Sequence, residues 1–122
     1  NGNLSIYNIA TSTAGCSSNT AFGNAPYDVA AFGGQLYIVT QTNDSLYVAQ
    51  ENGTGATILY TFTPNTKNPS AVAVLPNGNI LVAQSGTDSI DLVSPIGTLL
   101  KQDFIVNPFT VDVSDILVVS PQ

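Results

Sequence analysis

Residues 68–100 alternate short apolar runs with turn residues, and this rhythm constrains the fold more than any other feature of the chain. Apolar runs at 72–75 and 80–83 are separated by a Pro-Asn-Gly-Asn turn, and a Ser-Gly-Thr-Asp turn leads to an alternating run at 90–93. Such runs, bounded by Gly, Pro, Asn and Asp, predict antiparallel strands joined by tight turns. No 3.6-residue periodicity is present, so no helix is expected.

The same pattern recurs along the chain. Similar segments open at Pro26, Pro69 and Pro108, which are 43 and 39 residues apart. Beyond the first turn, the first two copies align at an offset of 44 residues. The second copy has one extra residue in that turn, and exposed turns tolerate such insertions. Repeats of about 40 residues are typical of the four-stranded blades of a β-propeller. The aligned pairs include Leu36 with Ile80, Ile38 with Val82, Asp44 with Asp88, and Leu46 with Ile90.

The third copy stops halfway, and its missing half is found at the other end of the sequence. Residues 107–122 supply two apolar runs and then stop. When residue 1 is placed after residue 122, the pattern continues without a gap into residues 1–24. The aligned pairs across this junction are Ile116 with Ile80, Leu4 with Ile90, and Ile6 with Leu92.

We therefore expect one all-β domain of three four-stranded antiparallel propeller blades, with one blade split between the two termini and completed by another copy. The expected blades are 25–67, 68–106, and the split blade made of 107–122 and 1–24, of which 10–20 is read as a long loop. The expected strands are 29–32, 35–40, 46–50 and 57–63; then 72–75, 79–83, 90–93 and 98–104; then 111–113, 116–119, 4–9 and a strand within 17–22.

The split blade requires a partner. Propellers close with about 4–8 blades, so three blades leave apolar faces and strand edges uncovered. Two copies that pair twice give a closed six-bladed ring with twofold symmetry, whereas a contact that does not close gives a helical filament. The remaining alternative is a fragment or one module of a longer array. The residues expected at the seam between copies are Leu4, Ile6, Ile116, Leu117, Val118 and Val119.

Residues 68–100 resemble the NHL repeat in their Asn-Pro opening, Val-Ala-Val run, Asn-Gly-Asn-Ile turn and later Asp. Residues 36–39 and 80–83 also resemble the YVTN repeats of surface-layer propellers. These resemblances imply a propeller fold and specify little about function. NHL repeats commonly carry an Arg before the third strand, where this chain has Ser45, Ser89 and, across the junction, Asn3. An RNA-binding NHL face is therefore not expected.

Charge is scarce. Charged residues make up 8% of the chain, against roughly 25% in typical proteins, and the net charge is −6 with Lys67 and Lys101 as the only cations. Nucleic acid and anionic lipid both require clustered cations, so neither is an expected partner. No apolar run approaches the ~20 residues of a membrane span. A surface of Asn, Thr, Ser, Gln and Gly is common in secreted proteins, so we expect an extracellular or cell-surface location.

The chain begins without Met and shows no signal peptide, as expected of a processed mature chain or of a shortened one. Cys16 has no second cysteine in the chain and cannot form an internal disulfide, so it is expected to be a buried or semi-buried thiol, with a disulfide to another chain as the alternative.

The chain contains few of the residues that commonly carry out catalysis. The chain has no His, so a Ser-His or Cys-His pair and a catalytic zinc site are unavailable, and neither an enzyme nor a cofactor is expected. Propeller lactonases resemble the expected fold and hold a metal at the channel mouth. By that resemblance Asp28 and Asp112 are candidate Ca²⁺ ligands, although solvated strand-end carboxylates are the preferred interpretation. Asp44 and Asp88, at matching turns, are expected to cap those turns by bonding backbone amides.

The function expected from these features is a self-assembling structural subunit, joined to other copies by strand pairing. The alternative is a ligand-binding ring, either lectin-like or with a Ca²⁺ site, and a lactonase-like enzyme comes third. Lectin pockets of small-repeat propellers use Trp and Arg, which this chain lacks. Glycans are an expected attachment at three sequons in predicted turns, whose acceptors are Asn3, Asn43 and Asn52.

Overall fold

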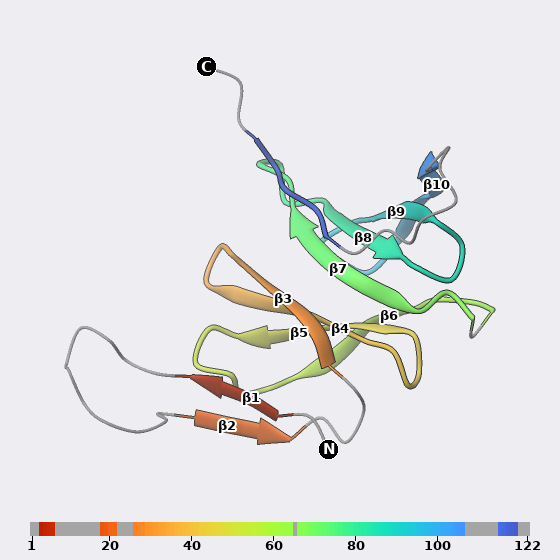
Figure 1. Cartoon of the computed structure of the whole chain (residues 1–122). Coiled ribbons are helices and arrows are strands. Elements are labelled where there is room, and N and C mark those ends of the chain that lie inside the picture. The colour runs from red at the N-terminus through yellow and green to blue at the C-terminus, as the bar shows by residue number, and fades with distance from the viewer. Residues whose placement is uncertain (1–2, 7–17, 22–25, 65, 107–114, 120–122) are drawn as a thin grey trace.

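The computed structural model describes residues 3–6, 18–21, 26–64, 66–106 and 115–119. In these residues the chain forms ten β-strands and no helix, as the sequence predicted. The strands make two four-stranded antiparallel sheets and one two-stranded sheet. Figure 1 shows the three sheets stacked in one direction, in the order of the sequence.

The first sheet contains β3 (Pro26–Phe32), β4 (Gln35–Thr40), β5 (Ser45–Gln50) and β6 (Thr57–Thr61), paired in chain order. A two-residue loop joins β3 to β4. Its residues, Gly33 and Gly34, have φ angles of 59° and 77°. Two consecutive positive φ values are what a tight hairpin between right-twisted strands requires, and glycine adopts them without steric cost.

The second sheet contains β7 (Pro69–Val74), β8 (Ile80–Gln84), β9 (Ser89–Val93) and β10 (Leu99–Val106), again paired in chain order. Its first loop is longer, and the amides of Leu75 and Gly78 bond to the carbonyls of Asn79 and Leu75 at 2.8 Å each. The extra residue predicted between the two copies therefore lies in an exposed turn and leaves the strand pairing unchanged.

The two sheets share one hydrogen-bonding register. Leu36 pairs with Ala49 in the first sheet, and Ile80 pairs with Val93 in the second, so both partners are shifted by the same 44 residues. Both opening strands begin at a proline, Pro26 and Pro69, and both show a register shift directly after it. These strands start three residues earlier than predicted, because proline is tolerated at the first position of an edge strand.

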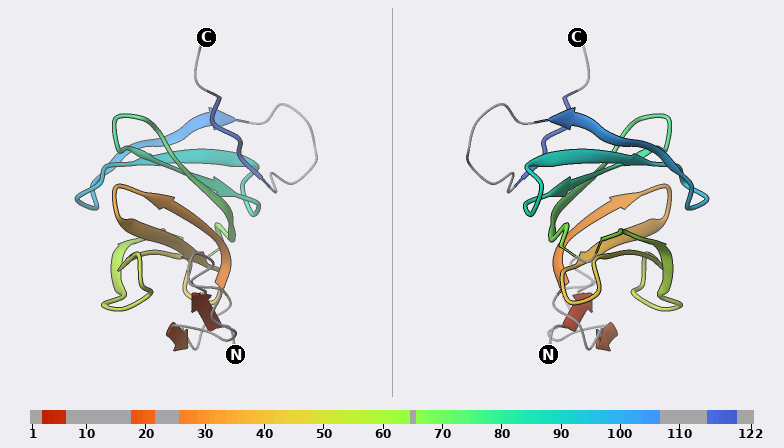
Figure 2. Two further views of the ribbon diagram at one scale, coloured as in Figure 1. Left: turned by 90° about the vertical axis from the view of Figure 1, so that its left-hand side faces the viewer. Right: turned by 90° about the vertical axis from the view of Figure 1, so that its right-hand side faces the viewer.

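The first and second sheets pack face to face. One apolar core joins them, with side chains from β4, β5 and the end of β6 on one side and from β7, β8 and β9 on the other. At Gly97 the approach is so close that an added Cβ would lie 2.5 Å from the Leu59 carbonyl oxygen of β6. Figure 2 shows this stack from two sides. The buried members of the core are Tyr37, Val39, Leu46, Phe62, Val72, Ile80, Val82 and Val93.

The two-stranded sheet, called the N-terminal sheet below, pairs β1 (Asn3–Ile6) with β2 (Ser18–Ala21) in antiparallel fashion. It matches the third and outer strands that the sequence predicted for the split blade, and the rest of the predicted strand 4–9, residues 7–9, lies outside the described residues. The prediction of a strand at 116–119 is wrong for the single chain, in which residues 115–119 have no strand pairing. A strand needs a hydrogen-bonding neighbour, and the predicted neighbour β1 lies elsewhere. The predicted strand at 111–113 lies outside the described residues.

Candidate functional site: the two ends of the sheet stack

The two segments that the sequence assigns to a split blade lie at opposite ends of the stack. The N-terminal sheet lies beside the first sheet, on the side away from the second sheet (Figure 1). Residues 115–119, called the C-terminal segment below, lie at the end formed by the second sheet, beside β7 (Figures 1 and 2). The two pieces that the repeat assigns to one blade are therefore separated by two complete sheets.

The C-terminal segment is extended and has two distinct faces. Its exposure alternates, with Ile116 and Val118 half-buried and Leu117 and Val119 exposed at 85% and 75%. Strand residues alternate between faces in this way. The repeat aligns Ile116 and Val118 with Ile80 and Val82, which point toward the preceding sheet. The segment thus has the side-chain phase of a blade strand although it lacks strand pairing.

Two of the six predicted seam residues, Leu4 and Ile6, lie on β1 of the N-terminal sheet. Leu4 pairs with Thr20 and Ile6 pairs with Ser18, so β2 occupies one edge of β1. Within the described residues the sheet contains no third strand, and the other edge of β1 is left without a strand neighbour. An edge strand in this state presents backbone donors and acceptors to any complementary strand.

Asp28 serves the packing of the two sheets. Its Oδ2 accepts a hydrogen bond of 3.0 Å from the backbone N–H of Val72, and this bond ties β3 to β7. The carboxylate predicted as a candidate Ca²⁺ ligand therefore faces the neighbouring sheet and accepts from its backbone. The other candidate, Asp112, lies outside the described residues. Among the described residues no group of three His, Cys, Asp or Glu could hold a metal ion.

One of the two turn aspartates, Asp44, bonds to a more distant residue than predicted. Asp44 and Asp88 both have positive φ, at 46° and 51°. Asp44 is buried, and its Oδ2 accepts a 2.9 Å hydrogen bond from the N–H of Lys67, in the linker between the two sheets. The expected amide bond exists, but it joins the turn to the next sheet rather than closing the turn itself. The Oδ1 atoms of Asp44 and Asp88 are buried and have no hydrogen-bond partner.

An ionic cluster, which the sequence did not predict, joins buried Lys67 in the linker to buried Asp91 and half-exposed Asp103 in the second sheet. Lys67 Nζ lies 3.8 Å from Asp91 Oδ2 and 3.9 Å from Asp103 Oδ1. Lys67 and Asp91 are 3% and 1% exposed. Asp91 also accepts from Gln84 Nε2 at 3.2 Å and from the backbone N–H of Asp103 at 2.8 Å.

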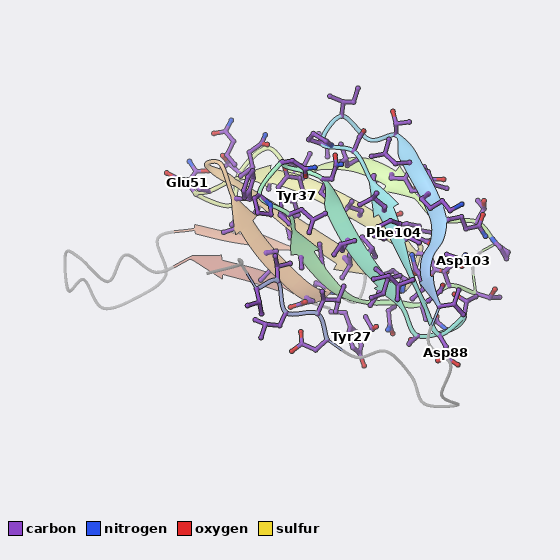
Figure 3. The ribbon with its side chains drawn as sticks, turned by 90° about the horizontal axis from the view of Figure 1, so that it is seen from above. Tyr27, Tyr37, Glu51, Asp88, Asp103 and Phe104 are labelled. Atoms are coloured by element: carbon purple, nitrogen blue, oxygen red, sulfur yellow. The ribbon has the colours of Figure 1, made fainter. Side chains whose placement is uncertain are left out.

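This cluster shapes the outer edge of the second sheet. Asp103 has a φ of 50° and lies in an irregularity of β10 between Lys101 and Ile105. Asp103 and the next residue, Phe104, are seen on this strand in Figure 3. Irregular edges of this kind resist pairing with other strands. The first sheet has Tyr47 where the second has Asp91, so the repeat alone could not reveal the cluster.

The sequons differ in their surroundings. Asn52 is exposed in the β5–β6 turn, and its Oδ1 accepts from the N–H and hydroxyl of Thr54 at 3.0 and 2.6 Å. Asn43 is half-buried, and its amide donates to the Tyr47 hydroxyl at 3.2 Å. Asn3 lies at the start of β1.

Secretion through a eukaryotic cell therefore distinguishes two of the sequons. We expect a glycan at Asn52 and none at Asn43, because attachment at Asn43 consumes the amide that bonds Tyr47 and places a sugar in a half-buried turn. Mass spectrometry of the secreted protein, with Asn52→Gln as the matched control, measures the occupancy. Occupancy of Asn43 equal to that of Asn52 contradicts this assignment.

No helix within the described residues is long and apolar enough to cross a membrane. Comparisons with models of known families, with characterised proteins and with solved structures give no match for this chain. Interpretation of the two ends therefore depends on the chain's own repeat and on the positions of its sheets.

Proposed function

We propose that this chain is a self-assembling structural subunit of an extracellular or cell-surface β-propeller. One copy contributes two complete blades, the first and second sheets, and one half of a blade at each end of the stack. The observation that carries the proposal is the separation of the N-terminal sheet from the C-terminal segment by those two sheets (Figures 1 and 2). A single chain that keeps this stack cannot join its own halves, whereas two copies can.

The shared register specifies how two copies pair. In each complete sheet the second and third strands pair at equivalent positions. Transferred through the repeat, this register pairs Val119 of one copy with Leu4 of the other, and Leu117 with Ile6. The free edge of β1 then gains the strand that the C-terminal segment does not form alone. Backbone hydrogen bonds along a sheet edge are a common source of affinity between chains.

Burial of the blade faces favours closure. A sheet that is stacked between two others has both of its faces buried. The apolar core between the first and second sheets is one such contact. A ring repeats that contact at every blade, so a six-bladed ring of two copies leaves no end face exposed. A filament repeats it without limit.

A structural role fits the chemistry better than catalysis or ligand binding. The chain has no His, Asp28 is committed to the backbone of Val72, and the two cations are Lys67, which is buried, and Lys101. A surface rich in neutral polar residues suits a protein exposed outside the cell. The described residues thus offer strand edges and apolar faces, which are means of assembly.

Electron microscopy of negatively stained protein tests the proposal. We expect discrete rings with six lobes, or fibres if the contact does not close. The matched control is the variant Val118→Pro, because proline lacks the N–H needed for strand pairing and is confined to strand ends and edges. A field of particles no larger than a single chain, with the unchanged sequence, would refute the proposed function.

A further inference from the structure

The inner strand of the first sheet carries an apolar surface that its equivalent in the second sheet does not expose. Tyr27 and Val29 on β3 are 60% and 45% exposed, whereas the equivalent Ser70 and Val72 on β7 are 5% and 4% exposed. Figure 3 shows Tyr27 at the margin of the ribbon. The contrast between equivalent positions shows that β7 has a covering neighbour and that β3 lacks one on this face.

The face concerned is the one turned away from the second sheet. Val29 pairs with Ile38, and residues paired across antiparallel strands point to the same side. Ile38 belongs to a small buried cluster with Leu36 and Ala49, separate from the core between the sheets. Asp28, between Tyr27 and Val29, points the other way, toward Val72. Val29 therefore lies on the face of this second cluster, and the exposed side chains of Val29 and of Tyr27, on the same strand, are called the inner patch below.

The N-terminal sheet lies on the same side of the first sheet but supplies only the third and outer strands of a blade. The strands still missing from that blade are the first and second. In the contact between the complete sheets, β7 packs against both β3 and β4, the first and second strands of the preceding blade. By the same geometry, β3 is free to pack against the first and second strands of a preceding blade. The repeat assigns those two strands to residues at the other end of this chain.

We infer that the inner patch of one copy is the docking surface for the C-terminal segment of a second copy, with Leu117 and Val119 as the inserted side chains. Through the repeat these residues are equivalent to Tyr37 and Val39 of the first sheet. Tyr37 and Val39 are buried in one cluster with Val72, which is the equivalent of Val29. In the inferred contact, Leu117 and Val119 therefore pack against the inner patch in the way that Tyr37 and Val39 pack against Val72.

Exposure of the inserted residues supports this occupant. Leu117 is 85% exposed and Val119 75% exposed, and because they alternate with Val118 they present two uncovered apolar side chains on one face of the extended segment. The inner patch carries no charged side chain, and neither do these residues. Two exposed apolar surfaces that the repeat places in contact are therefore complementary in chemistry as well as in position.

This contact rests on the proposed function and adds to it the face by which one copy recognises the next. It also makes the assembly directional, because the inner patch and the C-terminal segment are different surfaces. Such a contact is heterologous, and a pair of copies uses it twice to close a ring.

Thiol cross-linking tests the contact. Every variant carries Cys16→Ser, so that the introduced thiols are the only ones. Packed sheets lie about 10 Å apart, so a short bifunctional thiol reagent is used rather than oxidation. The chain Val29→Cys/Leu117→Cys is expected to be converted mostly into a covalent dimer, seen on a denaturing gel. The control for side-chain direction is Val29→Cys/Val118→Cys. It is expected to give little dimer, because Val118 lies on the opposite face of the segment, toward the second sheet of the same chain.

The outcomes separate this contact from the proposed function. Dimer formation that is strong with Leu117→Cys and weak with Val118→Cys supports the contact. If the Cys16→Ser chain assembles but neither pair cross-links, or both do so equally, the docking surface is wrong while the proposed assembly stands. If the unchanged chain does not assemble, both proposals fail.

Discussion

The substitution Leu117→Asp is expected to weaken assembly strongly while leaving the single chain folded. Leu117 is 85% exposed in the single chain, so a carboxylate at this position meets solvent and costs little there. In the assembly the same position lies between two sheets, where an unpaired carboxylate costs several kcal/mol. Each 1.4 kcal/mol is a factor of ten in an equilibrium constant, so assembly is expected to weaken by more than about a hundredfold.

A matched control exists on the same molecule. Ile96, in the turn between β9 and β10, is also 85% exposed but lies outside the seam. Ile96→Asp is therefore expected to leave both folding and assembly unchanged. Size-exclusion chromatography compares the two variants, and circular dichroism checks that both keep their β-structure. Equal assembly by Leu117→Asp and Ile96→Asp would show that Leu117 is not at the contact.

The substitution Lys67→Met is expected to destabilise the fold more than any other change of a single charge. Lys67 lies between Asp91 and Asp103 and is buried, as is Asp91. Removing one partner of a buried pair leaves the other charge unbalanced and typically costs 3–5 kcal/mol. Because the ion-pair distances of 3.8 and 3.9 Å are long, we expect the lower end, about 3 kcal/mol. Thermal unfolding measures this as a loss of about 10 °C in Tm.

Two further variants separate charge balance from packing. The double variant Lys67→Met/Asp91→Asn is expected to recover most of the loss, because no unbalanced buried charge remains. The introduced amide keeps an acceptor for the Asp103 N–H and brings a donor near Gln84, whose Oε1 has no partner. Lys101→Met, which removes the exposed cation, is expected to change stability by less than about 0.5 kcal/mol. If Lys67→Met is no worse than Lys101→Met, the cluster has no structural role.

The strands could be predicted closely because each is bounded by residues with a strong local preference. Gly33-Gly34 and Asn77-Gly78 mark turns that few other residues form, and strand β4 was predicted with both of its ends correct. Alignment of the repeats then supplied the sheet order. The starts of the strands at Pro26 and Pro69 were not predicted. Proline interrupts a central strand, but it is tolerated at the first position of an edge strand.

Contacts between elements distant in the sequence were harder to predict. The reach of Asp44 to Lys67 and the ionic cluster around Lys67 depend on how one sheet stacks on the next, and nothing local marks those residues. The cluster also breaks the repeat, since Tyr47 occupies the position of Asp91. The C-terminal segment shows the reverse case: its local pattern predicts a strand, but a strand forms only where a neighbour is available.

The mass of the particle in solution tests the central claim most directly. Sedimentation velocity of the unchanged chain, over a range of concentrations, distinguishes a 12.6 kDa monomer from larger species. Two half-blades that complete each other between copies predict that the monomer is a minor species and that the main boundary corresponds to twice that mass, or to long polymers. A single boundary at 12.6 kDa throughout the range would contradict the account.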